Sequence, residues 1–562
     1  MPNLDRGTYS KLYGPTVGDR LRLGDTALVV EVEDDVTSYG DELLGGCSKT
    51  LRDGMMVTGR QAKDSSLDML ISNVVLLDPE LGVRKTNIGI KDGRVVGVGR
   101  AGNPDVVDNV DLIIDSHTAV IPGEGMIATP GAIDSHVHLA SPGLMGVALS
   151  TGITTIVGMG LGGVWDVGVN PAANIDTLAR AWRDIPVNVS FLARGSTGNA
   201  DMLAAALTAG ASGFKVHEDF GAYPSLVDTA LGVAEEADVA VALHTDSLNE
   251  SGMLSDTLAA TRGRTVHAYH VEGGGGHPDL LEIVSEAGIL PSSTTPTVPM
   301  SVNTVEELFP MTMTVHRQSR SIPSDVEITR SRIREASIKA ENVLHECGAI
   351  SIINSDSMGM GRIGEMVRRT WQLASAATGR AGDDDRSNRP GAHNDRVLGY
   401  LAKITINPAI AHGLGHMVGS VAPGKLADIV LWDPRYFGTK PELVVKSGFV
   451  AWGASGDAGG STRISQPRVY RSFFGGEGDA ARKLSVLFGS RWAVEAGLEQ
   501  RLGRPVAAVR GTRSITKADM VGNSTTPTVR VPGDGAAVTI DGEPVELEPA
   551  RSVPLGQLYH FA

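Results

Sequence analysis

The sequence predicts an α/β fold: a (βα)8 TIM-type barrel accompanied by a β-rich domain built from N-terminal and post-barrel segments. The central part of the chain alternates short apolar runs with amphipathic helical runs, which is typical of a parallel sheet. Outside this part, β-branched runs surround the hairpin signal Asp92-Gly93, and similar strand-like text returns after residue 424. There are eight central apolar runs, the number of strands that closes a (βα)8 barrel. They are residues 132–139, 153–158, 187–193, 213–217, 239–244, 265–270, 289–293 and 349–355.

The length of the chain indicates several domains, because 562 residues are too many for one compact core. We predict an N-terminal β-rich domain over 1–128, the barrel over 129–422, and a returning β segment with the C-terminal region over 423–562. The connection before the eighth strand is long and holds helix-like text at 302–317 and 331–346. We expect it to form a lid at about 302–335.

Composition limits the classes of binding partner and the cellular compartments that we expect for this protein. A net charge of −15 disfavours nucleic acid and anionic membranes as partners. Cys47 and Cys347 lie far apart, which fits a reducing cytosol better than a disulfide framework. The N-terminus has no apolar signal-peptide core, and the uncharged run 139–165 is broken by Gly, Ser, Thr and Pro. We therefore expect a cytoplasmic protein and interpret that run as a barrel strand with its loops.

Potential metal ligands follow the predicted strands at the ends where barrel enzymes place their catalytic groups. His136 and His138 are two residues apart on a strand, so both side chains point to one face. The set predicts a binuclear metal site, and its members are His136, His138, Lys215, His244, His270 and Asp356. Imidazole and oxygen ligands without thiolate suit nickel, zinc, iron or manganese, and the spacing does not choose among them.

Lys215 is the least ordinary member of this set, because an ammonium group cannot bind a metal cation. Addition of CO2 to its amine would give a carbamate with two anionic oxygens, one for each metal. The sequence therefore indicates a hydrolase whose two metals are bridged by a modified lysine.

Three further polar residues lie close to these positions. His217 follows Lys215 by two residues, so it should face the same pocket, where it either donates a hydrogen bond to a substrate carbonyl or is a structural histidine at the rim. Asp219 either orients another group or is a solvated loop carboxylate. His267 precedes His270 by an odd offset, so on a strand we expect it to face away.

Long strings of the chain resemble the urease α (catalytic) subunit, a member of the metal-dependent amidohydrolase superfamily, from end to end. The most specific strings are Tyr13-Gly-Pro-Thr-Val-Gly-Asp, Lys215-Val-His-Glu-Asp, Leu243-His-Thr-Asp-Ser-Leu-Asn-Glu, Ser355-Asp-Ser-Met-Gly-Met-Gly-Arg and Ile404-Thr-Ile-Asn-Pro-Ala.

The resemblance implies two Ni²⁺ per chain, bridged by N6-carboxylysine at Lys215. One nickel would be held by His136, His138 and Asp356, and the other by His244 and His270. The same resemblance implies roles for five other residues. His217 would hold the urea oxygen, His316 in the lid would protonate the leaving ammonia, Arg332 and Asp219 would support these groups, and the Gly359 carbonyl would contact a urea nitrogen.

The resemblance also implies partners: smaller β and γ subunits in a trimer of heterotrimers, and accessory proteins for nickel loading. The activity would be urea degradation to ammonia and carbamate in nitrogen metabolism. The chain departs from the family pattern at Val315, where Cys is common, at Arg317, where a second His is usual, and in the loop at 160–169. The Gly273–Pro278 loop is also short.

Two alternatives stay open at this point. One is a barrel amidohydrolase that uses zinc on a cyclic amide. The other is a weakly active paralogue that acts mainly as an assembly subunit, which the departures at the lid and the 160–169 loop would favour.

Overall fold

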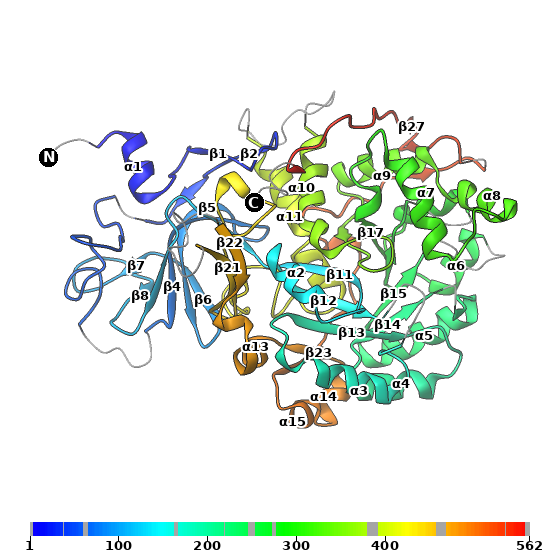
Figure 1. The fold of residues 1–562 in the computed structure, drawn as a ribbon, viewed down its shortest axis with the longest axis horizontal. Coiled ribbons are helices and arrows are strands. Elements are labelled where there is room, and N and C mark those ends of the chain that lie inside the picture. Colours follow the sequence, from blue (N-terminus) through cyan, green and yellow to red (C-terminus); the bar gives the residue numbers. More distant parts are fainter. Residues whose placement is uncertain are drawn as a thin grey trace.

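The computed structural model describes residues 4–37, 39–59, 66–161, 167–217, 220–245, 253–272, 277–378, 392–456, 468–533 and 535–556. Figure 1 shows a β-rich body, mostly blue, beside a larger body of strands and helices coloured from cyan to green. Strands from late in the chain, in orange, lie at the junction between the two bodies.

The larger body is a parallel barrel sheet in which each strand pairs with the next along the chain. Its strands are β11 (Ala132–His138), β12 (Ile153–Met159), β13 (Asn188–Arg194), β14 (Gly213–Val216), β15 (Ala240–His244), β16 (Val266–Tyr269), β17 (Ile289–Thr294) and β18 (Ile352–Asn354). All eight predicted strands are therefore confirmed, with small shifts at their ends. The last strand is the most shortened, at three residues.

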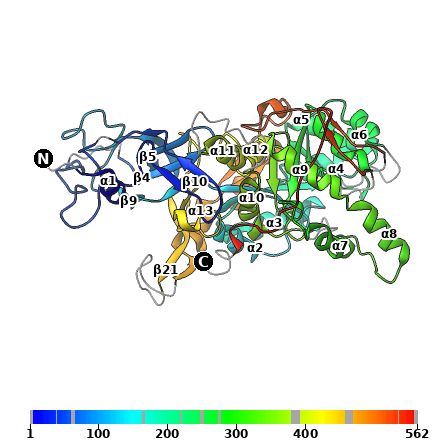
Figure 2. The same cartoon turned by 90° about the horizontal axis from the view of Figure 1, so that it is seen from above.

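Helical segments connect these strands, as a parallel sheet requires. They are α2 (Leu144–Ser150), α3 (Ala172–Ala181), α4 (Ala200–Ala209), α5 (Pro224–Ala237), α6 (Leu254–Thr261), the 3₁₀ segment η3 (Pro278–Ser285), α7 (Thr304–Val315), α8 (Pro323–Arg332) and α9 (Glu335–Glu346). Seen from above, α7 and α8 extend from the barrel on the side away from the β-rich body (Figure 2). The helix-like text at 331–346 belongs to the barrel layer instead, because α9 buries Ala340 and Leu344 in the barrel core.

The first and last barrel strands meet at a seam, not along a regular ladder. An isolated parallel bridge joins Val137 to Ser357. There the His138 N–H donates to the Ser357 carbonyl at 2.9 Å, and the Ser357 N–H donates to the His136 carbonyl at 3.3 Å. Asp134 reinforces the seam, since its Oδ1 accepts the Ser355 N–H at 3.0 Å. The barrel thus closes at the residues from which the predicted ligands project.

The β-rich body is a mixed sheet assembled from both sides of the barrel, as predicted. Strands before the barrel contribute β3 (Asp34–Asp35), β4 (Met69–Asp78), β5 (Gly82–Lys91), β6 (Arg94–Gly99), β9 (Ala119–Pro122) and β10 (Ile127–Pro130). Strands after it contribute β19 (Ile429–Trp432), β20 (Leu443–Lys446), β21 (Phe449–Gly456) and β22 (Arg468–Ser472). The two sets join where β10 pairs antiparallel with β19.

The C-terminal region also returns to the barrel, which the sequence analysis did not anticipate. Two short strands, β23 (Leu487–Gly489) and β24 (Val506–Ala508), extend the barrel sheet, because β23 pairs in parallel with β13. None of the helices in the described ranges combines the length and the hydrophobicity needed to cross a bilayer.

A buried ion pair ties the β-rich sheet to the barrel. Lys446 of β20 donates to Asp428 and to the Thr154 carbonyl of β12, the latter at 3.2 Å. The same carboxylate accepts the Asn188 side-chain amide of β13 at 2.7 Å. Both charged side chains are almost completely buried, so each depends on the other for compensation.

We expect Asp428→Ala to lower the free energy of unfolding by about 3–5 kcal/mol, because it leaves the Lys446 charge buried without its partner. The shift of the guanidinium unfolding midpoint of the metal-free chain measures this. Asp176→Ala is the control, since Asp176 pairs with Arg180 on the surface and should change stability by about 1 kcal/mol at most. Equal shifts for the two variants would contradict the account.

Candidate metal centre

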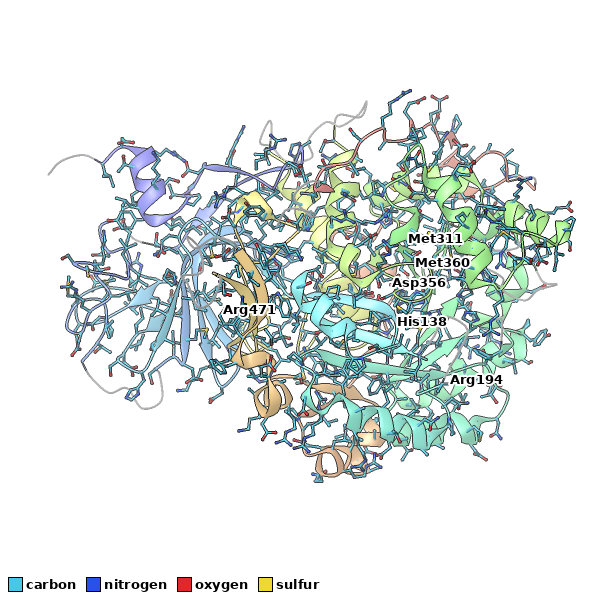
Figure 3. The ribbon with its side chains drawn as sticks, in the orientation of Figure 1. His138, Arg194, Met311, Asp356, Met360 and Arg471 are labelled. Carbon is cyan, nitrogen blue, oxygen red and sulfur yellow. The ribbon has the colours of Figure 1, made fainter. Side chains whose placement is uncertain are left out.

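Three predicted ligands lie together at the barrel seam. His136 and His138 come from the end of β11, and Asp356 follows β18. The Nε2 atoms of His136 and His138 lie 3.3 Å and 3.5 Å from Asp356 Oδ1. All three side chains are buried, and one donor atom from each lies within 4.8 Å of the others. Figure 3 shows His138 and Asp356 near one another, with Met360 close by and Met311 of α7 beyond them.

The pKa shifts of His136 and Asp356 suit a cation. Burial holds the pKa of His136 well below its ordinary value, and the neighbouring Lys215 and histidines act in the same direction. Burial alone would raise the pKa of Asp356, but the hydrogen bond and charge of His138, the charge of His270 and the Met360 N–H together bring that pKa below its ordinary value. Neutral imidazole and ionised carboxylate are the forms in which these groups bind divalent metals.

The second predicted group adjoins the first. His244 ends β15 and His270 follows β16, and their ring centroids are 4.3 Å apart. The His270 ring is also 5.5 Å from the His136 ring, so the two groups form one buried cluster. The imidazole donors of this pair, like those of the first group, fit a divalent metal.

Lys215 and His217 complete the cluster from β14. Lys215 Nζ lies 3.8 Å above the centroid of the Tyr269 ring, which in turn stacks on His136. The His217 ring stacks on the His244 ring, with centroids 4.0 Å apart. Ser196 fixes the His217 backbone, because its Oγ accepts the peptide N–H and donates to the carbonyl, both at 3.0 Å.

The expected orientation of His267 was wrong. Tyr269 reaches His136 and Lys215, so the inward face of β16 is the one that carries Tyr269 and His267. His267 points into the barrel, where its Nδ1 lies 2.9 Å from His412 Nε2. His270 also reaches the centre because β16 ends at Tyr269 and the backbone of His270 has φ +37°, which breaks the strand alternation.

The lid carries two of the predicted catalytic residues to this centre. His316 caps the C-terminus of α7, and Arg332 is the last residue of α8. Both line one cavity together with His244, His270 and Asp356. The predicted Asp219 lies outside the described residues, as do parts of the 160–169 and 273–278 loops.

The turn after β18 aims Asp356 and requires a glycine. Asp356 and Met358 both have positive φ, and the Met360 N–H donates to Asp356 Oδ2 at 3.1 Å. A Cβ on Gly359 would overlap Asp356 Oδ1, so any side chain there would displace the carboxylate.

Several residues of the centre were missed by the sequence analysis. Glu272 and Thr297 line the cavity, and Tyr269 stacks inside the cluster. Asp134 accepts the peptide N–H groups of His136 and Ser355, and burial raises the pKa of its carboxyl group to about 7. Its even spacing from His136 and His138 was an available signal, because it places all three on one face of β11.

We expect Gly359→Ala to weaken metal binding at least about 10-fold, because the new Cβ pushes Asp356 away from His136 and His138. Metal titration with a competing chelator measures the affinity. Gly232→Ala is the matched control, since that position on α5 has open space for a Cβ and should bind metal normally. Unchanged affinity in Gly359→Ala would show that Asp356 is not held as described.

Comparisons with known proteins find relatives along the whole chain. Residues 2–121 match the "Urease alpha-subunit, N-terminal domain" family, and residues 127–477 match the "Amidohydrolase family". Urease subunit alpha 2 of Streptomyces coelicolor is 48% identical over 563 residues, covering 99% of each chain. The urease subunit alpha of Natronomonas pharaonis is 47% identical over 566 residues, again covering 99% of each. The solved structure of a D-hydantoinase is a distant likeness, with 15% identity, a TM-score of 0.48, and coverage of 68% of this chain and 95% of its own. With nearly half of its residues identical to these alpha subunits along their whole length, this chain belongs to the urease alpha-subunit family within the amidohydrolases.

Proposed function

We propose that this member of the urease alpha-subunit family hydrolyses urea to ammonia and carbamate at the centre formed by the barrel strand ends and the lid. The carbamate would then decay to bicarbonate and a second ammonia. The observation that carries the proposal is the gathering of six ligand-type side chains, with His316 of the lid lining one cavity together with three of them.

The family implies a binuclear metal site, and we propose nickel as the metal. His136, His138 and Asp356 would hold one ion, and His244 and His270 the other. When bound, the two ions would polarise the urea oxygen and lower the pKa of a water molecule. Lys215 would bridge them as N6-carboxylysine, formed when its neutral amine bonds to the carbon of CO2 and releases one proton.

The remaining residues would act on urea directly or position the groups that do. His217 would donate a hydrogen bond to the urea oxygen, and its stacking on His244 supports that place beside the metals. The Gly359 carbonyl would accept a hydrogen bond from a urea N–H. His316 would give a proton to the leaving nitrogen, which is otherwise too basic to depart. Arg332 and Asp219 would hold these groups in position.

Further proposals follow from the family. We expect smaller β and γ subunits to assemble with this chain, as a trimer of heterotrimers in the cytoplasm, and accessory proteins to load the nickel. Membership of the urease alpha family disfavours the cyclic-amide alternative. Only a measurement of urea turnover distinguishes a weakly active paralogue from an active urease.

The direct test is to purify the chain with its smaller subunits and accessory proteins and to measure nickel content and ammonia release from urea. Two nickel ions per chain with sustained ammonia release would support the proposal. A fully loaded protein that releases no ammonia would identify an assembly subunit instead.

Lys215→Ala should lose tight nickel binding and urea hydrolysis together, because only a carbamate at this position supplies a bridging anion. Added formate or acetate with nickel should restore part of both. Lys339→Ala is the control, because this partly exposed lysine of α9 pairs with Glu335 of the same helix. A Lys215→Ala protein that binds two nickel ions tightly and turns over normally would refute the bridge.

His316→Ala should lower kcat by about 10²–10⁴-fold while leaving the nickel content unchanged, because a general acid is lost and no ligand is removed. Steady-state kinetics alongside metal analysis separates the two effects. His117→Ala, an exposed histidine of the N-terminal segment, should alter neither. Loss of nickel from His316→Ala would make this residue a ligand.

A further inference from the structure

We propose that Tyr269 is a positioning residue of the metal centre: its ring is the surface against which His136 and Lys215 are held in the places that the metals require. The inference rests on the proposed two-metal centre and deepens it, since it names a residue that binds neither metal nor substrate.

The ring of Tyr269 contacts two proposed ligands at once. It stacks on the His136 imidazole with centroids 4.0 Å apart and planes inclined by 16°. Lys215 Nζ lies 3.8 Å from the centroid of the same ring. Tyr269 is completely buried, so both contacts are made without competition from solvent. One side chain thus sets the relative positions of a ligand from β11 and a ligand from β14.

The hydroxyl group fixes this ring across the barrel. It donates a hydrogen bond of 2.7 Å to the carbonyl of Ser135, the residue before His136. Tyr269 belongs to β16, and β16 is not a neighbour of β11 in the sheet. The side chain therefore spans the interior and joins two strands that share no ladder. Such a tether holds the ring plane parallel to the His136 imidazole.

Two further histidines, His267 and His412, pack next to the Tyr269 ring inside the barrel. His267 packs edge-on against Tyr269 with ring centroids 4.5 Å apart, and its Nδ1 lies 2.9 Å from His412 Nε2. Burial lowers the pKa of both histidines, that of His412 to about 3, so both rings are neutral and one can donate to the other. Tyr269 and His267 are both almost completely buried, and dense packing of this kind restricts movement of the Tyr269 ring.

Positioning of this kind matters most for Lys215. Its side chain is long and flexible, and the amine must stay at one point between the two histidine groups for a carbamate to reach both metals. The ring face offers the neutral amine a weak N–H···π contact and no competing conventional hydrogen bond. The stacked ring likewise selects one orientation of the His136 imidazole, and groups that orient metal ligands typically contribute 10–100-fold to metal affinity.

The test compares the nickel affinities of the metal-free full chain and its variants, titrated with NiCl2 in the presence of bicarbonate and a competing chelator. Tyr269→Leu should bind nickel about 10–100-fold more weakly. Tyr269→Phe keeps the ring face and should recover most of that loss. Phe191→Leu is the matched control, because it removes an equally buried ring from β13 that packs against Trp182. It should lower thermal stability as Tyr269→Leu does while leaving nickel affinity unchanged.

The inference is overturned if Tyr269→Leu binds nickel as tightly as the unmodified chain, or if Phe191→Leu loses as much affinity. It is also overturned if Tyr269→Phe is as weak as Tyr269→Leu. Should the leucine variant fail to fold, Tyr269→Met, which fills the space more flexibly, takes its place with the same expected loss. Affinity is read without urea, so a chain that binds nickel but lacks turnover would contradict the proposed function and leave this inference standing.

Discussion

The seam between β11 and β18 is the constraint on which the rest of the site depends. Backbone hydrogen bonds of His136, His138 and Ser357 close the barrel there, and Asp134 Oδ1 accepts the peptide N–H groups of both Ser355 and His136. The ligands His136, His138 and Asp356 project from the two sides of this seam. Closing the barrel and assembling the metal cluster are therefore one structural event, and a shift of either strand would separate the donors.

Burying this many polar side chains destabilises the fold, and the contacts around the cluster offset part of that free-energy cost. Several imidazoles, an amine and a carboxylate are buried together, and groups taken out of water destabilise the fold unless they are paired. Burial holds the pKa of His136 well below its ordinary value, and the pKa of Asp356 lies below its own because neighbouring donors and charges outweigh its burial. A metal entering this set would offset the remaining cost, which couples metal binding to the stability of the barrel. The glycine at 359 and the positive φ of Asp356 belong to the same arrangement, because a Cβ at position 359 would overlap the carboxylate in its present place.

Much of this could be predicted from the sequence, because the signals are local. The apolar runs set the eight strands, and residues at their ends share an edge in any parallel barrel. His136, His138, Lys215, His244, His270 and Asp356 could therefore be grouped without coordinates. His267 was misjudged because the turn at His270 departs from strand geometry, and alternation holds only within a strand. The tether from Tyr269 to Ser135 and the pair formed by His267 and His412 could not be predicted, since each joins segments distant in sequence. The place of His316 was expected from family resemblance alone, because the sequence pattern at the end of a helix does not identify a catalytic proton donor.

The central claim is a pair of nickel ions bridged by a modified Lys215 beneath the lid. Crystals of the loaded enzyme measured at the nickel absorption edge test it most directly. The account predicts two anomalous peaks, one beside His136, His138 and Asp356 and the other beside His244 and His270, with continuous density from Lys215 reaching both. A single peak, or an unmodified Lys215 side chain between two occupied sites, would contradict it.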